Sequence, residues 1–135
     1  MNQIKEIELE KSVITLYDNR IVKIRFLTNI SFELEDAVIA NQTMHDLAEG
    51  KPFLSLVDTF NVRSQISKAA MDHFAKDPLT KGVRLAEALV INSLHNRILA
   101  SFYAKLTGSH SKTKVFAEFA PAIDWLLKIY KEQEK

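Results

Sequence analysis

Short β-rich runs alternate with longer amphipathic segments along most of the chain, and this alternation constrains the fold more than any other feature. Two β-rich runs, residues 12–17 and 21–27, come first, and a further short strand is expected before them at residues 6–9. The segment between the two runs, Asp18 to Arg20, suits a hairpin turn because Asp and Asn tolerate positive φ. The chain is therefore expected to open with a hairpin.

After the hairpin, amphipathic segments separate three more β-rich runs. The runs at residues 53–57 and 86–91 are almost wholly apolar, as strands covered on both faces are, and a last run follows at residues 114–117. Helices are expected to begin at Ser31, Ser67, Leu94 and Pro121, and the first three to end near Gly50, Pro78 and Gly108. This order predicts an α/β fold in which a mixed sheet has parallel later strands, right-handed crossovers and a covering of helices.

The third helical segment has the most regular apolar spacing. Its stripe, in which an apolar residue recurs every fourth position, consists of Leu94, Ile98, Phe102 and Leu106. In the first helical segment the apolar stripe includes Leu34 and Val38. Residues spaced in this way share one face of a helix, so both stripes are expected to pack against the core.

Composition excludes several functional classes. The 135 residues suit one domain, residues 1–135, with a single sizeable core. Eighteen basic and seventeen acidic residues give a net charge of +1, without the basic patch expected of a nucleic-acid-binding or membrane-binding surface. Cysteine is absent, which excludes disulfides and thiolate chemistry. The N-terminus lacks the apolar segment of a secretory signal, and no apolar run approaches membrane-spanning length, so a cytoplasmic location is expected.

At the level of architecture the chain resembles the STAS-type domain, the fold of bacterial anti-sigma factor antagonists, and more closely the SpoIIAA-like (STAS/SEC14) group. The resemblance spans nearly the whole chain. Its local carriers are the strand that ends at Asp58, the loop that leads into the Ser67 helix, the segment 84–90, and the ending from residues 115–117 through 122–126.

The resemblance implies a regulatory role that depends on binding another protein. In antagonists of this fold a kinase phosphorylates a serine at the start of the helix that follows the Asp-terminated strand. Ser67 matches that position by spacing, and Ser64 is its neighbour. The Asp-Ser-Ser-Gly signature of the antagonists is replaced here by Gln65-Ile66-Ser67-Lys68, and Ser67 also suits the role of a helix N-cap.

The loop before the Ser67 helix is the candidate surface for a protein partner or for a second copy in a homodimer. Phe60, Val62 and Ile66 are three apolar residues in an otherwise polar loop, more than a connector needs. With Asp58, Ser64 and Ser67 they make up the predicted partner-binding or switch residues. The leading hypothesis is a regulatory or signalling domain without catalysis.

Polar residues are also expected to gather at the carboxyl ends of the parallel strands, where ligands bind in open α/β sheets. This polar edge consists of Asn92, Ser93, His95, Asn96 and Arg97. Asp58, Ser93 and His95 have the residue types of a hydrolytic triad, but Ser93 lacks the Gly-x-Ser-x-Gly elbow that would expose its hydroxyl. No catalytic residue is therefore predicted.

Cofactor and metal sites are not predicted either. The four histidines have no shared ligand spacing, and three glycines cannot form a Gly-rich phosphate loop. The alternative function, suggested by the SEC14 side of the resemblance, is a carrier or sensor of a small apolar ligand. It requires a cavity beneath the helices, lined by residues such as Met44, Met71, Phe74 and Phe102.

Overall fold

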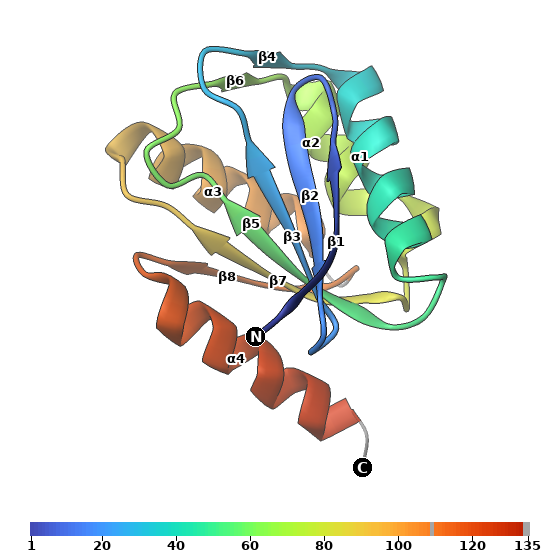
Figure 1. The fold of residues 1–135 in the computed structure, drawn as a ribbon. Coiled ribbons are helices and arrows are strands. Elements are labelled where there is room, and N and C mark those ends of the chain that lie inside the picture. Colours follow the sequence, from blue (N-terminus) through green and yellow to red (C-terminus); the bar gives the residue numbers. More distant parts are fainter. Residues whose placement is uncertain (109, 134–135) are drawn as a thin grey trace.

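The computed structural model of the chain, which describes residues 1–108 and 110–133, is a layered α/β fold around one large sheet (Figure 1). The strands are β1 (Gln3–Glu8), β2 (Ser12–Tyr17), β3 (Ile21–Phe26), β4 (Ser31–Phe32), β5 (Phe53–Asp58), β6 (Gln65–Ile66), β7 (Arg84–Val90) and β8 (Lys112–Phe116). The helices are α1 (Leu34–Leu47), α2 (Lys68–Lys76), α3 (Leu94–Thr107) and α4 (Phe119–Gln133), with a 3₁₀ turn at Pro78–Thr80.

The large sheet has six strands in the order β1-β2-β3-β5-β7-β8. The first three strands pair antiparallel, and β3, β5, β7 and β8 pair parallel, so the predicted mixed sheet with parallel later strands is confirmed. The hairpin turn also lies where it was expected, and Arg20 takes the positive φ of 68° that closes it. Parallel pairing places the carboxyl ends of β3, β5, β7 and β8 at one rim.

Helices cover both faces of the sheet. Figure 1 shows α1, α2 and α3 on one face and α4 alone on the other. The larger core lies under the first three helices and includes Phe53 and Val57 of β5, whereas Leu54 and Leu56 of the same strand face α4. The alternation along β5 confirms that this apolar run is a strand buried on both faces.

A second, two-stranded sheet was not predicted. β4 and β6 pair parallel, with Phe32 opposite Ile66, and Phe32 is buried against Phe26 in an edge-to-face contact. Ser31 is consequently a strand residue, and the prediction that it caps the first helix is wrong. The helix begins after Glu33 instead, whose N–H donates to the Asp36 carboxylate at 2.8 Å.

The prediction that the Leu94 stripe packs in the core is wrong for Leu94, Ile98 and Phe102, whereas Leu106 does pack against the core. Leu94 is 75% exposed, Ile98 62% and Phe102 40%. The buried face of α3 is formed instead by Asn96, Ala100, Tyr103 and Thr107, with Leu99 and Leu106 packed beside it. The helix carries two stripes, and the less apolar one, whose members are four, three and four residues apart, faces the sheet because Asn96 and Tyr103 find buried hydrogen-bond partners there. In α1, Leu34 and Val38 are likewise exposed.

Within residues 1–108 and 110–133, no helix combines the length and apolar character needed to cross a membrane.

Candidate functional site

The loops that follow β5 and β7 meet at the carboxyl rim of the sheet, as the sequence predicted. The Asn61 N–H donates to Asn92 Oδ1 at 2.9 Å, and Asn92 Nδ2 donates to Asn61 Oδ1 at 2.6 Å. Thr59 adds a backbone and a side-chain hydrogen bond to the Val90 carbonyl. These bonds hold the two loops together at the rim.

Asp58 shapes the first loop from within. Its side chain is buried, and Oδ1 accepts the N–H of Phe60 at 3.0 Å, the geometry of an Asx turn. Asn61 then takes a positive φ of 58°, which a short polar side chain tolerates. Asp58 therefore directs the chain out of the strand and offers little of its carboxylate to a partner.

The three apolar loop residues differ in exposure. Phe60 is the most exposed, and its ring lies 5.8 Å from that of Phe119 at the start of α4. Val62 and Ile66 are half-buried and pack against the larger core. Phe60 can therefore meet a partner directly, whereas Val62 and Ile66 mainly anchor the loop.

The two candidate switch serines are both engaged in hydrogen bonds. Ser67 caps α2, where its Oγ accepts the N–H of Ala70 at 3.0 Å. Ser64 Oγ donates to the Leu27 carbonyl and is part-buried. A phosphate on Ser67 would lie at a helix N-terminus, where free N–H groups stabilise negative charge, whereas one on Ser64 would have to break an existing bond.

The five residues of the polar edge also have separate roles. Ser93 caps α3 by accepting the N–H of Asn96 at 3.1 Å. Asn96 is buried, and its Nδ2 donates to the carbonyls of Thr59 and Val62 at 3.3 and 3.0 Å. His95 and Arg97 are exposed on the surface of α3. Asp58 and Ser93 thus each accept a hydrogen bond from a backbone N–H group.

A shallow groove of about 630 Å³ lies on the rim between the β4–β6 sheet and the start of α3. Three predicted site residues of the edge, Ser93, His95 and Asn96, line one side of it, and Ser64 lies on the other. Asn29, Ile30, Ser31, Val62, Arg63 and Gln65 complete the lining. Within the part of the chain that the structure describes, no cluster of His, Asp or Glu side chains could hold a metal ion.

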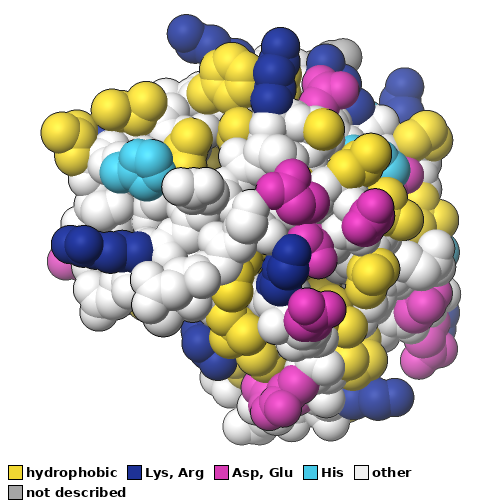
Figure 2. Space-filling view, turned by 90° about the horizontal axis from the view of Figure 1, so that it is seen from above, with side chains coloured by type: hydrophobic (Ala, Val, Ile, Leu, Met, Phe, Trp, Pro, Cys, Tyr) yellow, Lys and Arg dark blue, Asp and Glu magenta, His cyan; other side chains and the backbone are white. Residues whose placement is uncertain are grey.

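The exposed stripe of α3 is the feature that the sequence analysis missed. The stripe begins beside the groove and continues along the outer face of the helix, and it consists of Leu94, Ile98 and Phe102. Figure 2, which views the molecule from above, shows hydrophobic and basic side chains on the left flank, while most acidic side chains lie in the other half. The left flank is the side on which Figure 1 places α3. An exposed apolar surface of this kind is a candidate interaction site.

An apolar cavity of about 70 Å³ lies beneath α2 and α3. Of the residues predicted to line such a cavity, Met71 and Phe74 do so. Met44 is buried on α1 but does not line the cavity, and Phe102 is on the surface. The other lining residues are Phe26, Phe32, Val57, Thr59, Ile66, Ala70, Leu89, Ile91, Asn96, Leu99, Ala100 and Tyr103.

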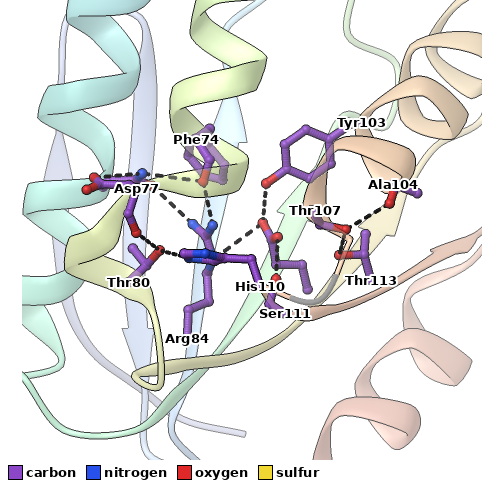
Figure 3. A network of polar contacts seen from close by, with 12 residues as sticks. Phe74, Asp77, Thr80, Arg84, Tyr103, Ala104, Thr107, His110, Ser111 and Thr113 are labelled. Atoms are coloured by element: carbon purple, nitrogen blue, oxygen red, sulfur yellow. Dashed lines mark hydrogen bonds and ion pairs between the residues drawn. The ribbon is translucent and has the colours of Figure 1, made fainter.

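A buried polar network lies deeper, beside this cavity (Figure 3). Tyr103 Oη and Ser111 Oγ donate to the two oxygens of Glu87, at 2.7 and 3.2 Å. Arg84 Nε is 3.6 Å from Glu87 Oε1, and its other nitrogens donate to Asn41 Oδ1 and the Phe74 carbonyl. Burial, together with the Glu87 charge, raises the pKa of Tyr103 well above its usual value. Because Arg84 and Glu87 are fully buried, the network serves the fold.

The comparison with solved structures supports the fold. An uncharacterized protein of the DUF3478 family from Shewanella loihica PV-4, described as having a SpoIIAA-like fold, aligns with a TM-score of 0.57 and 14% sequence identity. The alignment covers 90% of each chain. The resemblance to SpoIIAA-like domains is therefore confirmed for the architecture. Among curated proteins no match was found.

A sequence model of one family matches residues 14–130, from within β2, the first strand of the hairpin, almost to the end of α4. That stretch contains the rim, the groove and the exposed stripe of α3. The chain therefore belongs to the family described as "Domain of unknown function (DUF7793)".

Proposed function

We propose that this domain is a regulatory or signalling module that binds a protein partner and does no chemistry of its own. The observation that carries the proposal is the exposed stripe of α3, because Leu94 and Ile98 stay more than half exposed although they are large and aliphatic. The stripe begins at the rim, so Phe60 and the polar edge can border one continuous contact surface. A cytoplasmic location remains a prediction from the sequence.

The site supports docking better than catalysis. Ser93, Asn96 and Asp58 use their polar atoms on backbone groups and fix the loops in place. A rim that is rigid before the partner arrives loses less conformational entropy on binding. The SpoIIAA-like architecture is compatible with this role, and the phosphorylation of Ser67 implied by the resemblance would act as its regulation.

Capture of a partner by the immobilised protein tests the proposal. Ile98→Ser should abolish capture without unfolding the domain, because Ile98 is exposed. Ile39→Ser on α1 is the matched control, since Ile39 is 51% exposed on a different helix. Ile66 is a poor target because it is packed against the core. Capture that survives Ile98→Ser together with Phe60→Ser would contradict the proposed surface.

A second candidate function is the binding of a small apolar ligand, and the cavity beneath α2 and α3 favours it. At about 70 Å³ the cavity has room for only a few heavy atoms, so a larger ligand would have to move the helices apart. Native mass spectrometry should then show a bound adduct that Ala100→Leu removes, because Ala100 lines the cavity. A docking module without a ligand should show the bare mass in both proteins.

A further inference from the structure

The exposed stripe of α3 has the dimensions of a helix-docking site. Leu94, Ile98 and Phe102 follow one another at intervals of four residues, and a rise of 1.5 Å per residue places the ends of the stripe about 12 Å apart. This length corresponds to about two turns of a partner helix with apolar residues at positions i, i+3 or i+4, and i+7. Apolar anchors with that spacing fit this face.

The charged side chains of α3 itself are all basic. The helix α3 contains no Asp or Glu, whereas its Arg97 and Lys105 are exposed. At about 100° per residue, Arg97 and His95 fall on opposite sides of the stripe, and Lys105 lies near its line at the C-terminal end. Arg63 lines the groove next to the start of the helix. Carboxylates of a partner at these positions would be attracted to the basic side chains.

The other exposed apolar helix face differs in charge. On α1, Leu34, Val38 and Ile39 are exposed, but the charged neighbours on that helix are the acidic Glu35 and Asp46. The helices α1 and α3 lie on either side of α2 (Figure 1). Contact between α1 of one copy and α3 of another would be heterologous, and would build a ring or an open chain of copies rather than a two-fold dimer. A separate partner protein suits a closed complex better.

From these observations we propose that α3 docks an amphipathic helix of a partner protein, one whose apolar stripe is bordered by Asp or Glu. This inference rests on the proposed docking function and names the class of partner. Apolar burial supplies the affinity, and the Arg97 and Lys105 side chains select the acidic borders against basic ones.

Two synthetic helical peptides of about 18 residues test the selection. Both carry the same Leu stripe, one bordered by Glu and the other by Lys, and each is titrated with the full chain while fluorescence anisotropy is recorded. The Glu peptide should bind at least about tenfold more tightly, and the difference should shrink at high salt. Ile98→Ser should weaken binding of the Glu peptide by about tenfold or more, whereas Ile39→Ser on α1 should leave it unchanged. The double variant Arg97→Glu/Lys105→Glu should reverse the preference.

Equal affinity for the two peptides, or sensitivity to Ile39→Ser, would overturn the proposal. So would self-association in sedimentation velocity that Ile98→Ser abolishes, because the occupant would then be a second copy. Binding to anionic phosphatidylglycerol vesicles that depends on Ile98 and Arg97 would overturn it in favour of a membrane surface. If the peptides show no charge preference while Ile98→Ser still abolishes partner capture, the acidic-helix inference fails and the docking function stands.

Discussion

The hydroxyl of Tyr103 on α3 donates a 2.7 Å hydrogen bond to the carboxylate of Glu87 on β7, inside the larger core. This bond joins the helix that carries the proposed docking stripe to β7, the strand next to the edge strand β8. The face of α3 opposite Tyr103 can therefore stay apolar and exposed without the helix turning over to bury it. The same contact allows quantitative tests of the fold.

Replacing Tyr103 with Phe should destabilise the domain by about 1–2 kcal/mol, because a buried carboxylate loses one of its donors. Urea denaturation followed by circular dichroism measures the change in the free energy of unfolding. Tyr130→Phe on α4, outside this network, provides the control and should change stability by less than about 0.5 kcal/mol. Equal effects in the two variants would show that the Glu87 bond contributes no net stability.

The stability of the wild-type protein should fall at alkaline pH, partly because of Tyr103. Burial and the Glu87 charge raise its folded-state pKa well above 10, whereas in the unfolded chain the group ionises near pH 10. Its contribution is therefore fully present below pH 10, and is lost as the pH rises from there toward the folded-state pKa. The free energy of unfolding should consequently decrease more steeply between pH 9 and pH 11 in the wild type than in Tyr103→Phe. Parallel curves would contradict the assigned shift.

Arg84 should be more sensitive to substitution than any surface cation. Arg84→Met removes a fully buried charge and leaves Glu87 without its counterion, which costs about 3–5 kcal/mol. The double variant Arg84→Met/Glu87→Leu removes both charges and should recover part of that loss. Chemical denaturation of the two single variants and the double variant measures the coupling. Additive losses would mean that Arg84 and Glu87 stabilise the fold independently.

The regular parts of this fold could be predicted because local chemistry and tertiary packing agree in them. The turn at Asp18–Arg20 and the almost wholly apolar run in β5 give strong local signals, and Ser67 and Ser93 cap helices as their positions suggest. The same signals bring the loops after β5 and β7 together at one rim, where Asn61 and Asn92 pair.

The β4–β6 sheet and the orientation of α3 depend on contacts between residues far apart in the sequence, which no local periodicity of apolar residues encodes. β4 and β6 are two residues each, too short for an alternating pattern, and they form only because Phe32 is buried next to Phe26. In α3 the more apolar stripe faces solvent, because the buried partners of Asn96 and Tyr103 lie on other elements. Sequence periodicity identifies the helix but cannot tell which of its two stripes is buried.

Two substitutions of Ser67, the position that matches the antagonist phosphorylation site, can distinguish a structural role from a regulatory one. Ser67→Ala removes the acceptor for the Ala70 N–H and should cost about 1 kcal/mol of stability, whereas Ser67→Asp keeps an equally good N-cap and should cost almost nothing. If phosphorylation at this position regulates binding, Ser67→Asp should also reduce partner capture, because it adds negative charge two residues from Gln65, which lines the groove, whereas Ser67→Ala should capture normally. Urea denaturation and the capture assay on the same two variants supply both measurements. Normal capture by both variants, with stability lost only in Ser67→Ala, would leave Ser67 as a helix cap alone.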